Sequence, residues 1–89
     1  MPTVHLLISG KVQGVFYRAT ARQKAESLGL HGWIKNTPDN HVEATVSGTP
    51  EAVESFIDWC WQGSPRAEVS HVAVTPMPDG GFTGFNVIR

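Results

Sequence analysis

The chain has 89 residues, a formal net charge of −1, and 40% hydrophobic residues. This length fits one domain over residues 1–89, and the apolar content argues against a disordered chain. A charge near zero gives no overall attraction to nucleic acid or to an anionic membrane, so any anion site must be local.

The sequence has a single cysteine, Cys60, which excludes an internal disulfide and a zinc site built from thiolates. The 4 histidines are scattered without the spacing of metal ligands, and we expect no metal and no cofactor. The first residues lack a basic segment followed by a long apolar run, and no stretch approaches the roughly 20 apolar residues of a membrane span. We therefore expect a cytoplasmic monomer without nucleic-acid or membrane partners.

Alternating apolar residues predict a first strand over residues 3–12. Good helix formers with a buried apolar stripe follow over residues 17–28. Residues 32–36 and 41–47 are predicted as strands of a hairpin, because turn-forming residues lie between them at 37–40.

A second helix is predicted to follow Thr49, a favourable N-cap residue, with Pro50 at the first helical position. Its buried stripe at i, i+3, i+4, i+7 and i+8 is predicted to comprise Val53, Phe56, Ile57, Cys60 and Trp61. Trp59 is placed at the margin of that stripe. Residues 69–75 are predicted as a further strand, and residues 82–88 as an optional short strand at an edge.

The elements follow the order β-α-β-β-α-β. Two helices with one apolar face each must cover a sheet, so we predict an α+β two-layer sandwich with both helices on one face of an antiparallel sheet. This ferredoxin-like arrangement supports many functions and decides none of them.

Residues 10–18, between the first strand and the first helix, have the features of a phosphate site. A loop in this position can direct several backbone N–H groups at one point, and the start of the helix adds partial positive charge. Gly14 allows close approach to an anion, and the Arg18 guanidinium can bind two phosphate oxygens at once. An ordinary strand–helix turn with an exposed arginine is the alternative, and this physical pattern alone leaves both open.

Two motifs favour the phosphate site over an ordinary turn, because they resemble those of a known family. Residues 12–18, Val-Gln-Gly-Val-Phe-Tyr-Arg, resemble the signature of the acylphosphatase family, and residues 32–36, Gly-Trp-Ile-Lys-Asn, resemble its strand motif at the right interval. The similarity covers essentially the whole chain through Gly48, Val53, Phe56, Trp59, Cys60, Gly63, Pro65, Ala67 and Val69. Ser64 is a minor departure, because many members have a proline there.

The resemblance implies metal-free hydrolysis of acyl phosphates, which are small-molecule substrates. It implies that Arg18 binds the phosphate and that Asn36 orients the attacking water, although an asparagine at a strand end also often caps a turn. The residues implied in substrate binding, mainly through backbone N–H groups, are Gln13, Gly14, Val15, Phe16, Tyr17 and Arg18, with Thr37 as a weaker candidate that braces Asn36. A phosphate or sulfate ion is expected to fit the same site.

Other readings are weaker. An RNA-recognition module has the same order of elements, but it stacks bases on aromatic residues of its central strands. The outer positions of the predicted strand at 41–47 carry no aromatic residue: His41, Glu43, Thr45 and Ser47. A regulatory binder of acyl phosphates would need Arg18 but not Asn36.

Several details of the site stay open at this point. The acyl group is left open among acetyl phosphate, a glycolytic acyl phosphate, carbamoyl phosphate and a phosphorylated aspartate, with broad specificity expected. Phe16 and Trp33 flank the predicted site and either shape an acyl pocket or pack in the core. It is also open whether the carboxylate of Arg89 contacts the site, which a terminal strand would make possible.

Overall fold

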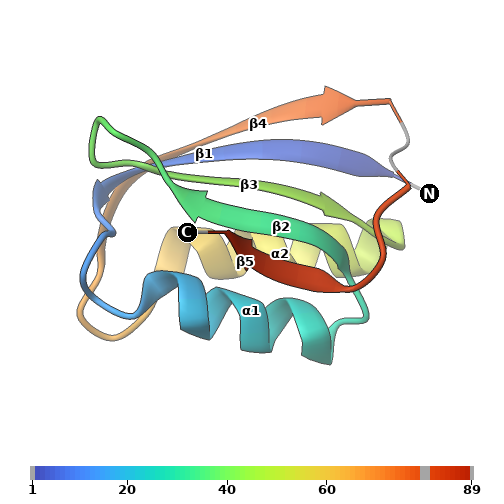
Figure 1. Ribbon diagram of the computed structural model, residues 1–89, viewed down its shortest axis with the longest axis horizontal. Helices are drawn as coiled ribbons and strands as arrows, with labels where there is room; N and C mark the ends of the chain where they lie inside the picture. The colour runs from blue at the N-terminus through green and yellow to red at the C-terminus, as the bar shows by residue number, and fades with distance from the viewer. Residues whose placement is uncertain (1, 79–80, 89) are drawn as a thin grey trace.

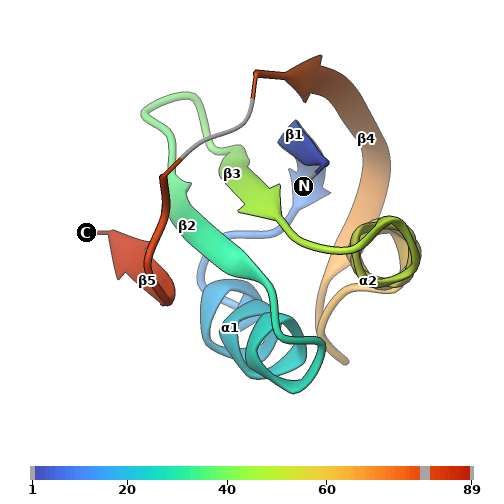
Figure 2. The ribbon, with the colours of Figure 1, turned by 90° about the vertical axis from the view of Figure 1, so that its right-hand side faces the viewer.

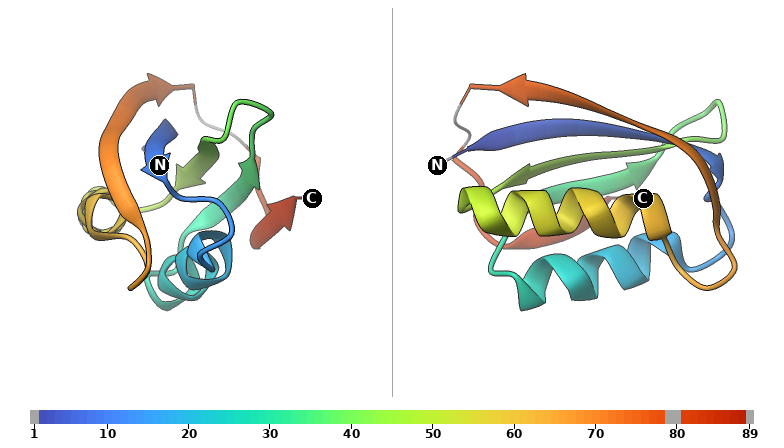
Figure 3. Two further views of the ribbon diagram at one scale, coloured as in Figure 1. Left: turned by 90° about the vertical axis from the view of Figure 1, so that its left-hand side faces the viewer. Right: turned by 180° about the vertical axis from the view of Figure 1, so that it is seen from behind.

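The computed structural model describes residues 2–78 and 81–88. The elements run in the order β1 (Thr3–Lys11), α1 (Tyr17–Ser27), β2 (His31–Asn36), β3 (Val42–Ser47), α2 (Pro50–Gln62), β4 (Glu68–Met77) and β5 (Phe85–Ile88). Both helices lie on the same face of one twisted sheet, as the end-on and rear views also show (Figures 1, 2 and 3). The predicted α+β two-layer sandwich is therefore confirmed.

The sheet has the strand order β4-β1-β3-β2-β5. The four longer strands pair in antiparallel fashion, as predicted. The optional terminal strand is present as β5, and it pairs parallel to β2, so that the complete sheet is mixed. Because β2 and β5 run in the same direction, their C-terminal ends lie side by side near the start of α1 (Figure 1).

The core lies between the sheet and the helices. Alternate residues of the central strands face the helices and are fully buried, among them Leu6, Ile8, Ile34, Ala44 and Val46. The helices meet them with Tyr17, Ala21 and Ala25 from α1 and with Val53, Phe56 and Cys60 from α2. Burial of this apolar surface is the main force that holds the two layers together.

The start of α2 agrees with the prediction. The side chain of Thr49 accepts a hydrogen bond from the backbone N–H of Ala52 at 3.2 Å, and Pro50 occupies the first helical position. An N-cap of this kind satisfies one of the backbone donors that the first helical turn leaves unpaired.

The prediction that Trp61 packs in the buried stripe of α2 is wrong, whereas Trp59 is half-buried, as expected at the margin of that stripe. Trp61 is 47% exposed and meets His71 edge-on, whereas Trp59 packs against Tyr17 with a ring-centroid distance of 5.1 Å. The reason is that α2 packs against α1 as well as the sheet. Trp59, three residues after Phe56, lies on the side of the helix that faces α1.

No helix in the described part of the chain is long and apolar enough to cross a membrane.

Candidate active site

The start of α1 and the C-terminal ends of β2 and β5 surround a cleft of about 960 Å³. Three segments that are far apart in the sequence meet here because β5 lies parallel to β2. The cleft is lined by Gly14, Phe16 and Arg18 from the loop and first turn of α1, by Asn36 from β2, and by Val87 and Ile88 from β5, among others. The two predicted catalytic residues, Arg18 and Asn36, are thus brought to one cleft.

The loop before α1 turns sharply. Gly14 and Phe16 both have left-handed backbone angles, with φ values of 72° and 59°. Within residues 2–78 and 81–88, none of the backbone N–H groups from Gln13 to Arg18 donates a hydrogen bond to another atom of the chain. Gly14, Phe16 and Arg18 line the cleft and carry unpaired N–H donors, as is typical of the start of a helix, whereas Gln13, Val15 and Tyr17 are not among its lining residues.

Two contacts of Val15 hold the loop before α1 against the rest of the protein. The side chain of Val15 is buried in the core, and its carbonyl accepts a hydrogen bond of 2.8 Å from the hydroxyl of Ser64. Ser64 is only 2% exposed, so this bond is protected from water. The residue that departs from the family pattern thus contacts the site loop directly, and no local pattern in the sequence predicts this contact.

The side chain of Gln13 points to the β2–β3 turn. Its amide donates to the carbonyl of Thr37 at 2.9 Å and to the carbonyl of His41 at 2.7 Å. Only the backbone N–H of Gln13 therefore remains for an anion. Its side chain instead connects the loop to the turn beside Asn36, a role that its sequence position did not reveal.

Asn36 carries an unusual polar atom. Its side-chain oxygen is buried and has no hydrogen-bond partner among the described residues. Asn36 follows Ile34 on the helix-facing side of β2, which directs it toward the cleft. Buried polar atoms in native proteins almost always have a partner, so this unpaired oxygen needs an explanation, which a contact with water or ligand in the filled cleft would supply.

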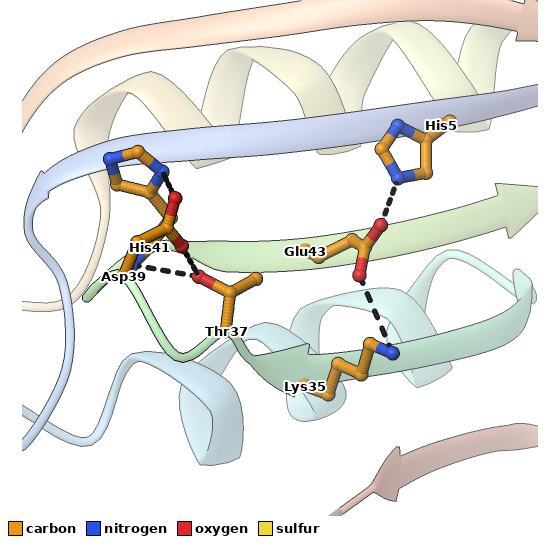
Figure 4. Close-up of polar contacts among 6 residues, drawn as sticks. All are labelled: His5, Lys35, Thr37, Asp39, His41 and Glu43. Carbon is orange, nitrogen blue, oxygen red and sulfur yellow. Dashed lines mark hydrogen bonds and ion pairs between the residues drawn. The ribbon is translucent and has the colours of Figure 1, made fainter.

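Thr37 does not brace Asn36 as expected. Its hydroxyl contacts the carboxylate of Asp39 and accepts a hydrogen bond of 3.1 Å from the backbone N–H of His41 (Figure 4). The hydrogen bond that the Thr37 hydroxyl donates to the Asp39 carboxylate is the main reason why the pKa of Asp39 lies below its usual range. Thr37 therefore stabilises the turn that follows Asn36 instead of the Asn36 side chain.

Arg18 lies in the first turn of α1 and is half-buried. One guanidinium nitrogen donates to the carbonyl of Ile88 at 3.3 Å, which holds the side chain against β5. A guanidinium has five N–H donors, so this single contact leaves donors for a ligand in the cleft.

The two flanking aromatic residues differ in position. Phe16 is 76% exposed and lines the cleft, so it does not pack in the core. Trp33 alternates with the buried Ile34 and lies on the opposite face of the sheet, with the ammonium of Lys35 5.4 Å from its ring. The expectation that Trp33 flanks the site is therefore wrong. The carboxylate of Arg89 lies outside the described residues.

Arg22 and Glu26 of α1 also line the cleft, whereas the other titratable groups considered next lie away from it. On the open face of the sheet, Glu43 contacts His5 at 2.7 Å and Lys35 at 3.5 Å (Figure 4). Cys60 is fully buried in α2, and burial raises its pKa to about 12. Among residues 2–78 and 81–88, no three His, Cys, Asp or Glu side chains gather closely enough to hold a metal ion.

The fold and the cleft define a small α+β sandwich in which a strand–helix loop, an arginine and an asparagine converge. The family model for acylphosphatases matches residues 4–87. An acylphosphatase from Methylococcus capsulatus is 47% identical over 90 residues, which span 100% of this chain and 98% of that protein. The chain therefore belongs to the acylphosphatase family, and its activity is the hydrolysis of acyl phosphates.

Solved structures agree with this assignment. A crystal structure of an acylphosphatase from Bacillus subtilis has a TM-score of 0.97 and 31% identity, with 100% of both chains covered. A structure of an acylphosphatase from Coxiella burnetii has a TM-score of 0.95 and 38% identity, and the match covers 98% of this chain and 92% of that one.

Proposed function

We propose that the protein hydrolyses the carboxyl–phosphate bond without a metal ion, with Arg18 and the loop N–H groups holding the phosphate and Asn36 orienting the attacking water. The observation that carries this proposal is the buried, unpaired side-chain oxygen of Asn36 in the cleft that Arg18 also lines. An acceptor in this position suits a water molecule that must be held beside a bound phosphate.

The proposal for phosphate binding rests on the positive charge of the site and on its unpaired N–H donors. The N–H groups from Gln13 to Arg18 have no partner among the described residues, and the start of α1 adds partial positive charge. The Arg18 guanidinium supplies a full charge and a planar pair of donors. Together these groups would stabilise the charge that develops on the phosphate oxygens in the transition state. Inorganic phosphate, the product, and sulfate would occupy the same position.

The proposal for the attacking water rests on Asn36. Its oxygen would accept a hydrogen bond from water and place the water oxygen opposite the acyl oxygen. The new bond forms between water and phosphorus while the bond from phosphorus to the acyl oxygen breaks, and the carboxylate leaves with the electron pair. The water proton passes to a phosphate oxygen.

The chemistry needs no further catalytic group. A carboxylate with a reference pKa of about 4 leaves readily, so no general acid has to protonate it. Phosphoryl transfer passes through a loose transition state, and the enzyme contributes mainly positioning and electrostatic stabilisation. Arg18 and the loop N–H groups supply the positive charge that a metal ion provides in other phosphoryl-transfer enzymes.

We also propose that the protein acts as a monomer in the cytoplasm. One chain supplies every group of the proposed mechanism. Its single cysteine, Cys60, is a free thiol, which is usual for proteins of a reducing compartment.

The test is hydrolysis of benzoyl phosphate in the presence of excess chelator, followed by its change in absorbance. We expect turnover that the chelator does not reduce and that Asn36→Ala lowers by a factor of about 100 or more, in the range of lost transition-state contacts. Asn86→Ala is the matched control, because Asn86 is exposed on β5 and does not line the cleft. Loss of activity with chelator, or full activity of Asn36→Ala, would refute the proposal.

A further inference from the structure

The cleft has an apolar part beside its polar groups. Phe16 is 76% exposed, more than any other large hydrophobic residue that the structure describes, and Ile88 is 42% exposed. Both residues line the cleft that also contains Arg18 and Asn36, as do Ala19 and Val87. An exposed apolar surface next to a polar site is typical of a surface that binds a ligand.

The stability of the fold does not explain why residue 16 has a large apolar side chain. The residue has a φ of 59°, a left-handed conformation that is unfavourable for a bulky side chain. Its side chain makes no capping hydrogen bond for α1 and does not pack in the core. A strained residue with an exposed apolar ring at a cleft indicates a functional contact.

The charges of the cleft favour an uncharged acyl group. Arg22 also lines the cleft, one turn after Arg18, and would be the natural partner of a second negative charge on the substrate. However, Glu26 lines the cleft as well and lies 3.7 Å from Arg22 in an ion pair. The two charges offset each other, so this end of the cleft offers no net attraction to an anionic acyl group.

We infer that the enzyme prefers acyl phosphates whose acyl group is apolar, and that Phe16 is the residue that determines this specificity. With the phosphate held by Arg18 and the loop, the acyl group packs on the Phe16 ring and on the apolar residues of β5. This inference rests on the proposed function, because the phosphate must be anchored where we propose. The inference predicts a higher kcat/KM for a substrate with an aryl or bulky alkyl group than for one with an acetyl group or a dicarboxylic acyl group.

The test compares kcat/KM for benzoyl phosphate and acetyl phosphate in the wild type and in Phe16→Ala, Phe16→Leu and Trp61→Ala. We expect Phe16→Ala to lower the benzoyl-to-acetyl ratio about tenfold, the scale at which apolar pockets discriminate. Phe16→Leu retains part of the apolar surface and should lower the ratio less. Since alanine and leucine both keep a Cβ at the same backbone angle, backbone strain does not explain a difference between them.

Trp61→Ala removes an exposed aromatic ring far from the cleft and should leave the ratio unchanged. An unchanged ratio in Phe16→Ala would overturn the inference. So would an equal loss for both substrates together with weaker inhibition by inorganic phosphate, because Phe16 would then act through the loop. A wild-type preference for succinyl phosphate that Arg22→Gln abolishes would also overturn it. A wild type inactive on every acyl phosphate would instead refute the proposed function.

Discussion

The side-chain amide of Gln13 donates a hydrogen bond of 2.9 Å to the carbonyl of Thr37, 24 residues later in the chain. A second bond from the same nitrogen reaches the carbonyl of His41 at 2.7 Å. Thr37 directly follows Asn36, and Gln13 begins the loop that leads to Arg18. This contact therefore fixes the distance between the two halves of the proposed active site.

Replacing Gln13 by alanine should disturb catalysis more than binding. We expect Gln13→Ala to lower kcat about tenfold or more, because small misplacements of catalytic groups are costly, while KM changes less. The loss of the hydrogen bonds should also lower the free energy of unfolding by about 1–3 kcal/mol. Steady-state kinetics and urea denaturation measure both effects. Gln62→Ala, at the exposed end of α2, is the control. A raised KM with an unchanged kcat would contradict this positioning role.

The proposed roles of Arg18 and Asn36 can be separated by phosphate binding. We expect Arg18→Ala to lose both turnover and the stabilisation that inorganic phosphate gives, because the variant loses the charge that holds the anion. Asn36→Ala should lose turnover but retain stabilisation by phosphate. A thermal-unfolding titration with phosphate tests the difference. Equal loss of binding in the two variants would refute this division of roles.

The contact between Ser64 and the site loop is open to a direct test. Ser64→Ala leaves the buried carbonyl of Val15 without its donor and should lower the free energy of unfolding by about 1–3 kcal/mol. Urea denaturation measures the loss, with the exposed Ser55→Ala as the control. If both variants are equally stable, the bond contributes nothing to holding the loop.

The contact between His5 and Glu43 predicts a pH dependence of stability. The hydrogen bond with His5 is the main reason that the pKa of Glu43 lies below its usual range. The folded state thus binds a proton less readily than the unfolded chain, so this contribution is complete above the ordinary glutamate pKa of about 4.3. It is lost as the pH falls through the lower folded-state pKa.

Urea denaturation of the wild type and Glu43→Gln between neutral and acidic pH measures this contribution. We expect the wild type to be the more stable at neutral pH and the difference to shrink as the pH falls. Glu54→Gln, on the exposed side of α2, is the control for a change of net charge. A difference between wild type and Glu43→Gln that does not vary with pH would contradict the prediction.

Cys60 should resist thiol reagents in the folded protein. Its side chain is fully buried, and burial raises its pKa to about 12, so almost no reactive thiolate exists at neutral pH. We expect a disulfide reagent to modify it only as fast as the protein unfolds. The same reaction in denaturant is the control. Rapid modification under native conditions would show that α2 opens readily.

Local patterns in the sequence were enough to predict the helices and strands and to locate the two motifs. Alternation along a strand places Asn36 on the same face as Ile34, and Thr49 with Pro50 marks the start of α2, because these preferences depend only on neighbouring residues. The family resemblance added the expected roles of Arg18 and Asn36, which chemistry alone left open.

The tertiary structure decided what depends on distant segments. The parallel pairing of β5, the packing of Trp59 against Tyr17, and the bond from Ser64 to the Val15 carbonyl each join residues far apart in the chain. The exposure of Phe16 likewise depends on how the loop before α1 is placed against the rest of the molecule. Such contacts are set by packing and register between elements, and the propensities of neighbouring residues carry no information about them.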